Sequence, residues 1–139
     1  MQINKITKAL IIVEAAGGFF LPVFNAFFMI LGVLAAISSG PILLGILWFL
    51  WLVAGWAGLA GVARLLTIIL GDKNNYNPRT TIVLLLFGLF AWGYFSYTTF
   101  FGAKDYYAYL PLITFPITLH FMFLARNHLL LAFNKANQL

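Results

Sequence analysis

Of the 139 residues in the sequence, 63% are apolar and only 8% are charged, whereas soluble domains average about 45–50% and about 25%. Eight basic and three acidic side chains, with a net charge of +5, cannot cover the polar surface that a soluble domain of this size needs. The composition therefore excludes the soluble globular, disordered and collagen-like classes, and the absence of cysteine excludes disulfide frameworks and thiol chemistry. We expect an all-α integral membrane protein.

The first apolar segment is expected to be a retained membrane-spanning helix. Gly18–Ile37 is free of charge, and about 20 mostly apolar residues are enough to cross a hydrocarbon core of ~30 Å. A cleaved signal peptide is disfavoured because the apolar run is too long and is interrupted by Glu14 and Pro22. The segment 38–41 (Ser-Ser-Gly-Pro) predicts a tight turn, since serine caps helices and proline suits a first helical turn.

Charge-free windows at 42–61, 82–101 and 106–125 predict three further spans. Thr80 or Thr81 is expected to cap the third helix, a turn is expected at 102–105, and Pro116 is expected to kink the fourth helix. We therefore predict a single four-helix transmembrane domain over residues 1–139, with spans at 10–37, 42–70, 81–101 and 106–125 and a cytoplasmic loop at 71–80.

The basic residues predict the orientation in the membrane. With four spans, both termini and the 71–80 loop share one side, which holds every Lys and Arg except Lys104. The positive-inside rule places this side in the cytoplasm, so we expect a multi-pass protein of the inner (plasma) membrane. The tyrosines within 94–109 agree, because they gather where the outer interface would lie. The cations attract anionic lipid, but they are spread over three segments and predict no nucleic-acid partner.

Glu14 is the only acidic residue outside the loops, and carboxylates within membrane spans are rare and often functional. It lies four residues before the charge-free window, roughly 6 Å towards the cytoplasm. Arg64 and Arg126 are expected at the same depth on the second and fourth helices, so our first interpretation is a structural ion pair with one of them. The alternative is that Glu14 carries a proton or a cation.

A second polar set inside the predicted spans consists of Asn25, Thr114, Thr118 and His120. These side chains either line a polar interior or each make one interhelical hydrogen bond, worth about 0.6 kcal/mol. His120 is expected roughly 9 Å inside the level of Arg126. It has no potential ligand nearby at metal-binding spacing, so we expect no metal site. His128 is expected to be solvated in the C-terminal tail.

Small residues on the second helix predict a packing surface. Small residues four positions apart allow two helix backbones to approach closely. The pairs on the second helix are Ala54/Gly58 and Ala57/Gly61, and Gly32/Ala36 on the first helix is the expected complement. The sequence leaves open whether this surface packs within the chain or against a partner.

No catalytic or cofactor-binding motif is present: HExxH, GxSxG, P-loop and Rossmann glycine patterns are absent. We therefore expect a non-enzymatic protein without a cofactor. Its contacts with another membrane protein, or with a second copy of itself, would lie within the bilayer, as in an accessory subunit or an immunity-type factor. Membrane-resident immunity proteins against pore-forming toxins are similar in size and number of spans.

A transporter is the second hypothesis. The segment Leu10–Ala15, which carries Glu14 in the first of four helices, is similar to the arrangement in small multidrug resistance transporters. The resemblance implies an oligomeric, proton- or cation-coupled transporter that uses Glu14. Two features depart from that family, because the charge bias opposes dual topology and Glu14 is shallower than a midplane site. A third possibility is an assembly or lipid-organising protein without a ligand of its own.

Overall fold

The computed structural model describes residues 4–40, 42–71, 76–101 and 110–134, apart from the side chains at 21, 25, 36, 39, 94–101, 110–113 and 134. Within these ranges every regular element is an α-helix, which confirms the all-α prediction. The helices are α1 (Lys5–Ser39), α2 (Ile42–Leu70), α3 (Pro78–Phe101), α4 (Leu110–Leu124) and α5 (Arg126–Asn134).

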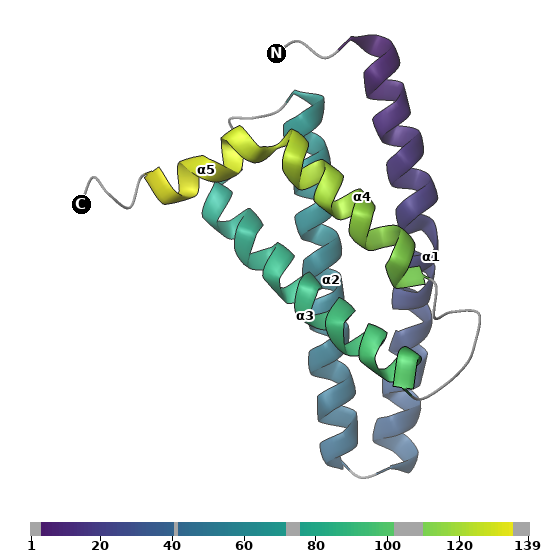
Figure 1. Ribbon diagram of the computed structural model, residues 1–139. Helices are drawn as coiled ribbons and strands as arrows, with labels where there is room; N and C mark the ends of the chain where they lie inside the picture. The colour runs from purple at the N-terminus through teal and green to yellow at the C-terminus, as the bar shows by residue number, and fades with distance from the viewer. Residues whose placement is uncertain (1–3, 41, 72–75, 102–109, 135–139) are drawn as a thin grey trace.

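Helices α1 and α2 form a long antiparallel hairpin, and the other helices pack against one part of it (Figure 1). α3 crosses α2 obliquely and makes its most extensive contact there, whereas α4 packs on α1 and α2. α5 turns away from the end of α4 and packs across the start of α3. The start of α1, the end of α2 and the start of α3 therefore lie towards the same end of the bundle.

This end is called the charged end below, because Lys8, Arg79 and Arg126 lie on the helix ends that meet there. The buried core occupies the same region: Leu65 and Phe121 have no exposed surface. Towards the α1–α2 turn, by contrast, large apolar side chains of both helices face outward. Examples are Leu34, Ile37, Ile42, Leu43 and Leu47.

One helix, α2, is long and apolar enough to cross a membrane, judged over the described residues. α1 is a second candidate if its two straight parts, Lys5–Phe20 and Pro22–Ala35, form one span; they meet at an angle of 42°. Proline causes such bends because it has no N–H for the carbonyl four residues earlier and its ring clashes with that carbonyl. The apolar stretches Pro78–Gly93 and Thr114–Leu124 are shorter.

The start of α3 differs from the expected cap at Thr80 or Thr81. The helix begins at Pro78, and the backbone N–H of Arg79 donates to Oδ1 of Asn77 at 3.0 Å. Asn77 is therefore the N-cap, and proline takes the first helical position, where its missing N–H costs nothing. The turn expected at 102–105, the first residues of the fourth span (106–109) and the side chains of the tyrosines within 94–109 lie outside the described residues.

Candidate functional site

Glu14 of α1 and His120 of α4 form a hydrogen-bonded pair across the two helices. Oε1 of the carboxylate lies 2.8 Å from Nδ1 of the imidazole. A carboxylate only accepts hydrogen bonds, so Nδ1 carries the proton when Glu14 is ionised. The side chains are 30% and 48% exposed respectively, which places the pair at the surface of the bundle.

The ion pair that the sequence predicts between Glu14 and Arg64 or Arg126 is not what the structure shows. The Arg64 guanidinium lies 5.6 Å from the centre of the Tyr76 ring, and that of Arg126 lies 4.3 Å from the centre of the Phe123 ring. Both arginines therefore stack on aromatic faces, a favourable arrangement for a cation at a protein surface. His120, which was placed in the intramembrane polar set, takes the position expected for an arginine.

The depth of the pair can be measured from the charged end. Lys8 lies six residues before Glu14, and its Nζ reaches the carbonyl of Leu70 at the end of α2. Arg126 follows His120 by the same number of residues. At 1.5 Å per helical residue, the pair thus lies about 9 Å from the charged end on both helices. Glu14 is at the level of His120 and therefore further from the charged end than its expected level beside Arg126.

The pair lies on a surface formed by one side of each helix. Residues four and three apart share a helix side, and on the outward edge of that side Leu10 and Gly17 flank Glu14 while Pro116 and Phe123 flank His120, all four exposed. This surface, called the α1–α4 face below, consists of Leu10, Glu14, Gly17, Pro116, His120 and Phe123. A Cβ built on Gly17 meets nothing within 4 Å, so open space adjoins the carboxylate.

Of the remaining polar candidates, the two described threonines turn away from this pair. Thr114 and Thr118 are turned towards the centre of the bundle, and the Thr118 hydroxyl donates to the Thr114 carbonyl of its own helix at 2.8 Å. The side chain of Asn25 lies outside the described residues. His120 faces outward and therefore does not contribute to a polar interior with Thr114 and Thr118.

The small-residue surface of α2 packs within the chain. Ala54, Gly58 and Gly61 are buried, and Gly58 meets Gly88 of α3 backbone to backbone. Ala57 is half-buried. In the expected complement on α1, a Cβ on Gly32 meets nothing within 4 Å, so Gly32 makes no close helix contact, and the Ala36 side chain lies outside the described residues.

Hydrogen bonds to backbone carbonyls organise the charged end. Nζ of Lys8 donates to Leu70 at 2.8 Å, and Nε of Arg79 donates to Ala132 of α5 at 3.3 Å. Nε2 of His128 lies 3.1 Å from the carbonyl of Tyr76. His128 therefore belongs to a packed helix, α5, and not to the solvated tail that the sequence predicts.

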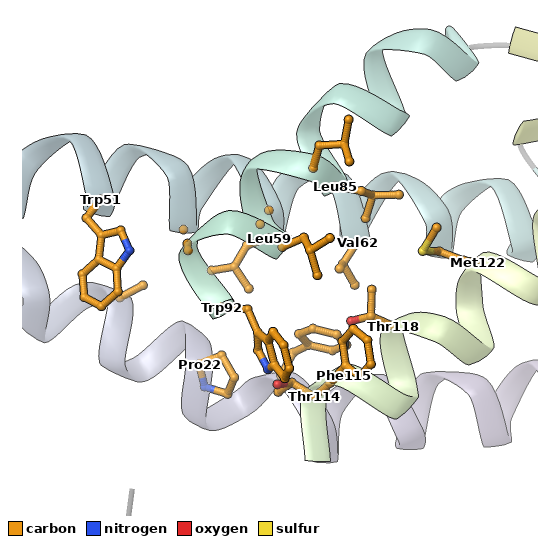
Figure 2. Close-up of a pocket in the computed structure, with 18 of the residues that line it drawn as sticks. Pro22, Trp51, Leu59, Val62, Leu85, Trp92, Thr114, Phe115, Thr118 and Met122 are labelled. Atoms are coloured by element: carbon orange, nitrogen blue, oxygen red, sulfur yellow. Dashed lines mark hydrogen bonds between the residues drawn. The ribbon is translucent and has the colours of Figure 1, made fainter. Parts of the chain in front are cut away.

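A cavity of about 410 Å³ lies between the first four helices. Its walls are aliphatic and aromatic, and they include Trp92 stacked on Phe115 with ring centres 4.5 Å apart. Figure 2 shows Trp51 towards one end of the cavity, Met122 towards the other, and Pro22, Trp92 and Phe115 along one wall. Among the described residues of the lining none is charged, and the hydroxyls of Thr114 and Thr118 are the side-chain oxygens that it contains.

The sequence matches no protein-family model, no curated protein and no solved structure. The likeness to small multidrug resistance transporters stays a likeness of one helical segment. Functional inference therefore depends on two features of the described residues, the α1–α4 face and the apolar cavity.

Proposed function

We propose that this chain is a four-span protein of the inner (plasma) membrane, with both termini in the cytoplasm, that acts without catalysis by binding another membrane protein inside the bilayer. The placement is supported by α2 and the bent α1, by the apolar stretches of α3 and α4, and by outward-facing apolar side chains. Such side chains are compatible with lipid but would be costly in water, at about 25 cal/mol per Å². The cations at the charged end support the orientation.

The observation that carries the proposal is the half-exposed Glu14–His120 pair. On four spanning helices, this pair would lie about 9 Å inside the cytoplasmic boundary, at a depth where polar groups are rare and expensive. The two side chains partly satisfy one another, but the remaining carboxylate oxygen and the far imidazole nitrogen would face hydrocarbon. A partner that presents polar groups to the α1–α4 face would remove that cost.

The same geometry explains why the pair would serve recognition better than folding. Replacing both members of a buried ionic pair by apolar residues is often neutral or stabilising. Stability alone therefore gives little reason to have Glu14 and His120 on this face. An accessory subunit or an immunity-type factor needs such a polar feature to choose one partner among many apolar helices.

The test is purification in mild detergent from the native host, with identification of bound proteins and an absolute mass for the particle. Wild-type protein is expected to retain a stoichiometric membrane protein. The double variant Glu14→Leu/His120→Leu is expected to insert and fold but to lose it. The matched control Thr80→Leu/Asn127→Leu replaces two exposed polar residues outside this face and should retain the partner. Retention of the partner by the Glu14/His120 variant would refute the proposal.

The pair also favours a second candidate function, proton- or cation-coupled transport by an oligomer of this chain. Carboxylates and imidazoles inside membranes are the groups from which proton relays are built. This candidate predicts a homo-oligomer and no second protein. In liposomes, Glu14→Gln would abolish flux while leaving abundance and oligomeric mass unchanged. A monomeric particle, or flux that survives the substitution, would exclude it.

A further inference from the structure

The cavity between the helices has an elongated shape along α2. Its lining on that helix runs from Trp51 through Gly55 and Leu59 to Val62, which is one side of the helix over three turns. Eleven residues at 1.5 Å each correspond to about 16 Å along the axis. A hydrocarbon core of ~30 Å consists of two leaflets, so the cavity is about as long as one leaflet is thick.

The chemistry of the described walls disfavours a polar occupant. A bound water needs two to four polar partners. The Thr118 hydroxyl already donates to the Thr114 carbonyl, and none of the lining residues that the structure describes is charged. Ligand pockets of roughly 300–1,000 Å³ are typically lined by aliphatic and aromatic groups, and this cavity of about 410 Å³ belongs to that class. Such a lining suits a hydrocarbon better than a polar ligand.

The space is produced by specific features of the sequence. The Pro22 ring at the bend of α1 lines one wall, and small residues line the others where larger side chains would fill it. Gly55 is the clearest case, since it lines the cavity and a Cβ built on it meets nothing within 4 Å. Gly58, one turn further along α2, contacts the backbone of Gly88, and this contact joins α2 and α3 beside the cavity.

We infer that this cavity binds a single hydrocarbon chain, supplied either by a membrane phospholipid or by a free fatty acid. The chain would lie along α2 against the Trp92–Phe115 stack. This site needs the membrane placement proposed above but not the α1–α4 face. Glu14→Leu/His120→Leu should therefore keep the bound chain, and loss of partner binding would leave this inference intact.

The test compares wild-type protein with Gly55→Leu, which places a side chain in the open space. In the first arm, each protein is reconstituted in nanodiscs of a phosphatidylethanolamine–phosphatidylglycerol mixture and released for native mass spectrometry. In the second arm, a brominated fatty acid is added in detergent and quenching of tryptophan fluorescence is followed, since Trp51 and Trp92 line the cavity. Wild-type protein is expected to retain a phospholipid mass in the first arm or to show saturable quenching in the second.

Gly55→Leu is expected to lose the retained mass and the saturable quenching. Its matched control is Gly32→Leu, the same substitution at a glycine that also has open space but does not line the cavity. Leucine has the higher helix propensity at both positions, and circular dichroism will show that both variants are folded. Retained phospholipid identifies a lipid chain, and quenching alone identifies a free fatty acid. Equal binding by wild type and Gly55→Leu, or no binding by wild type, overturns the inference.

Discussion

Gly58 of α2 and Gly88 of α3 meet where the two helices cross, with no side chain between their backbones. A Cβ at Gly88 would lie 2.6 Å from the Cα of Gly58. Gly61, on the same side of α2, continues the contact, because a Cβ there would lie 3.1 Å from the backbone nitrogen of Leu85. The backbones of α2 and α3 therefore have no room to accept a side chain at the crossing.

Gly58→Leu is predicted to destabilise the protein by about 1–3 kcal/mol, the usual cost of inserting extra groups into a packed interface, because the helices must separate. The measurement is unfolding in mixed micelles by increasing SDS, followed by circular dichroism. Gly55→Leu is the matched control, since it makes the same change one turn away in open space. Equal midpoints for the two variants would contradict the close approach at Gly58.

The sequence predicted the small-residue surface of α2 but not the helix that covers it. Gly88 is flanked four residues away by Leu84 and Trp92, so it does not belong to a pair of small residues. A single glycine in an apolar helix does not by itself predict a helix-packing contact. The choice between α1 and α3 depends on how the helices cross, which local spacing does not encode.

The sequence also does not predict that Glu14 pairs with His120, although it indicates both residues as candidates. Charge-free windows indicate the relative depths of two residues only where both helices are straight and upright. α1 is bent at Pro22, and α4 ends in α5, so the windows do not mark equal depths. The helix α5 had a usable signal: Ala125, Leu129 and Ala132 are buried and repeat at helical spacing.

Lys8→Met is predicted to lower stability by about 0.5–2 kcal/mol, because it removes a charged hydrogen bond and a cation at a helix C-terminus. Nζ of Lys8 donates to the carbonyl of Leu70, and the chain leaves α2 through Gly71 with a positive φ of 134°. The same SDS titration measures the effect, with the exposed Lys5→Met as control. An equal loss in both variants would indicate only a general charge effect.

Gly18 and Ile117 are predicted to be coupled at the α1–α4 contact. A Cβ on Gly18 would collide with Cδ1 of Ile117. Gly18→Ala should therefore make the flexible end of the Ile117 side chain move, which offsets part of the gain that alanine brings in a helix, and Ile117→Ala should remove that cost. The expected interaction energy in a double-mutant cycle is about 0.5–3 kcal/mol, typical of residues in contact. Additive effects would show that the two residues are not in contact, and Gly17→Ala, which enters open space, serves as the control.

The hydrogen bond between Glu14 and His120 predicts a specific pattern of stability in the isolated protein. His120→Leu leaves the Glu14 carboxylate without its partner about 9 Å from the charged end, and Glu14→Leu leaves the imidazole in the same position. Each single variant should be less stable than wild type, whereas Glu14→Leu/His120→Leu should recover most of the loss, since no polar group is then stranded. The coupling is expected to be about 0.5–3 kcal/mol. It is measured by a double-mutant cycle in SDS unfolding, with Arg126→Leu as a third single variant. Coupling of Glu14 to Arg126 in place of His120 would restore the ion pair that the sequence favoured.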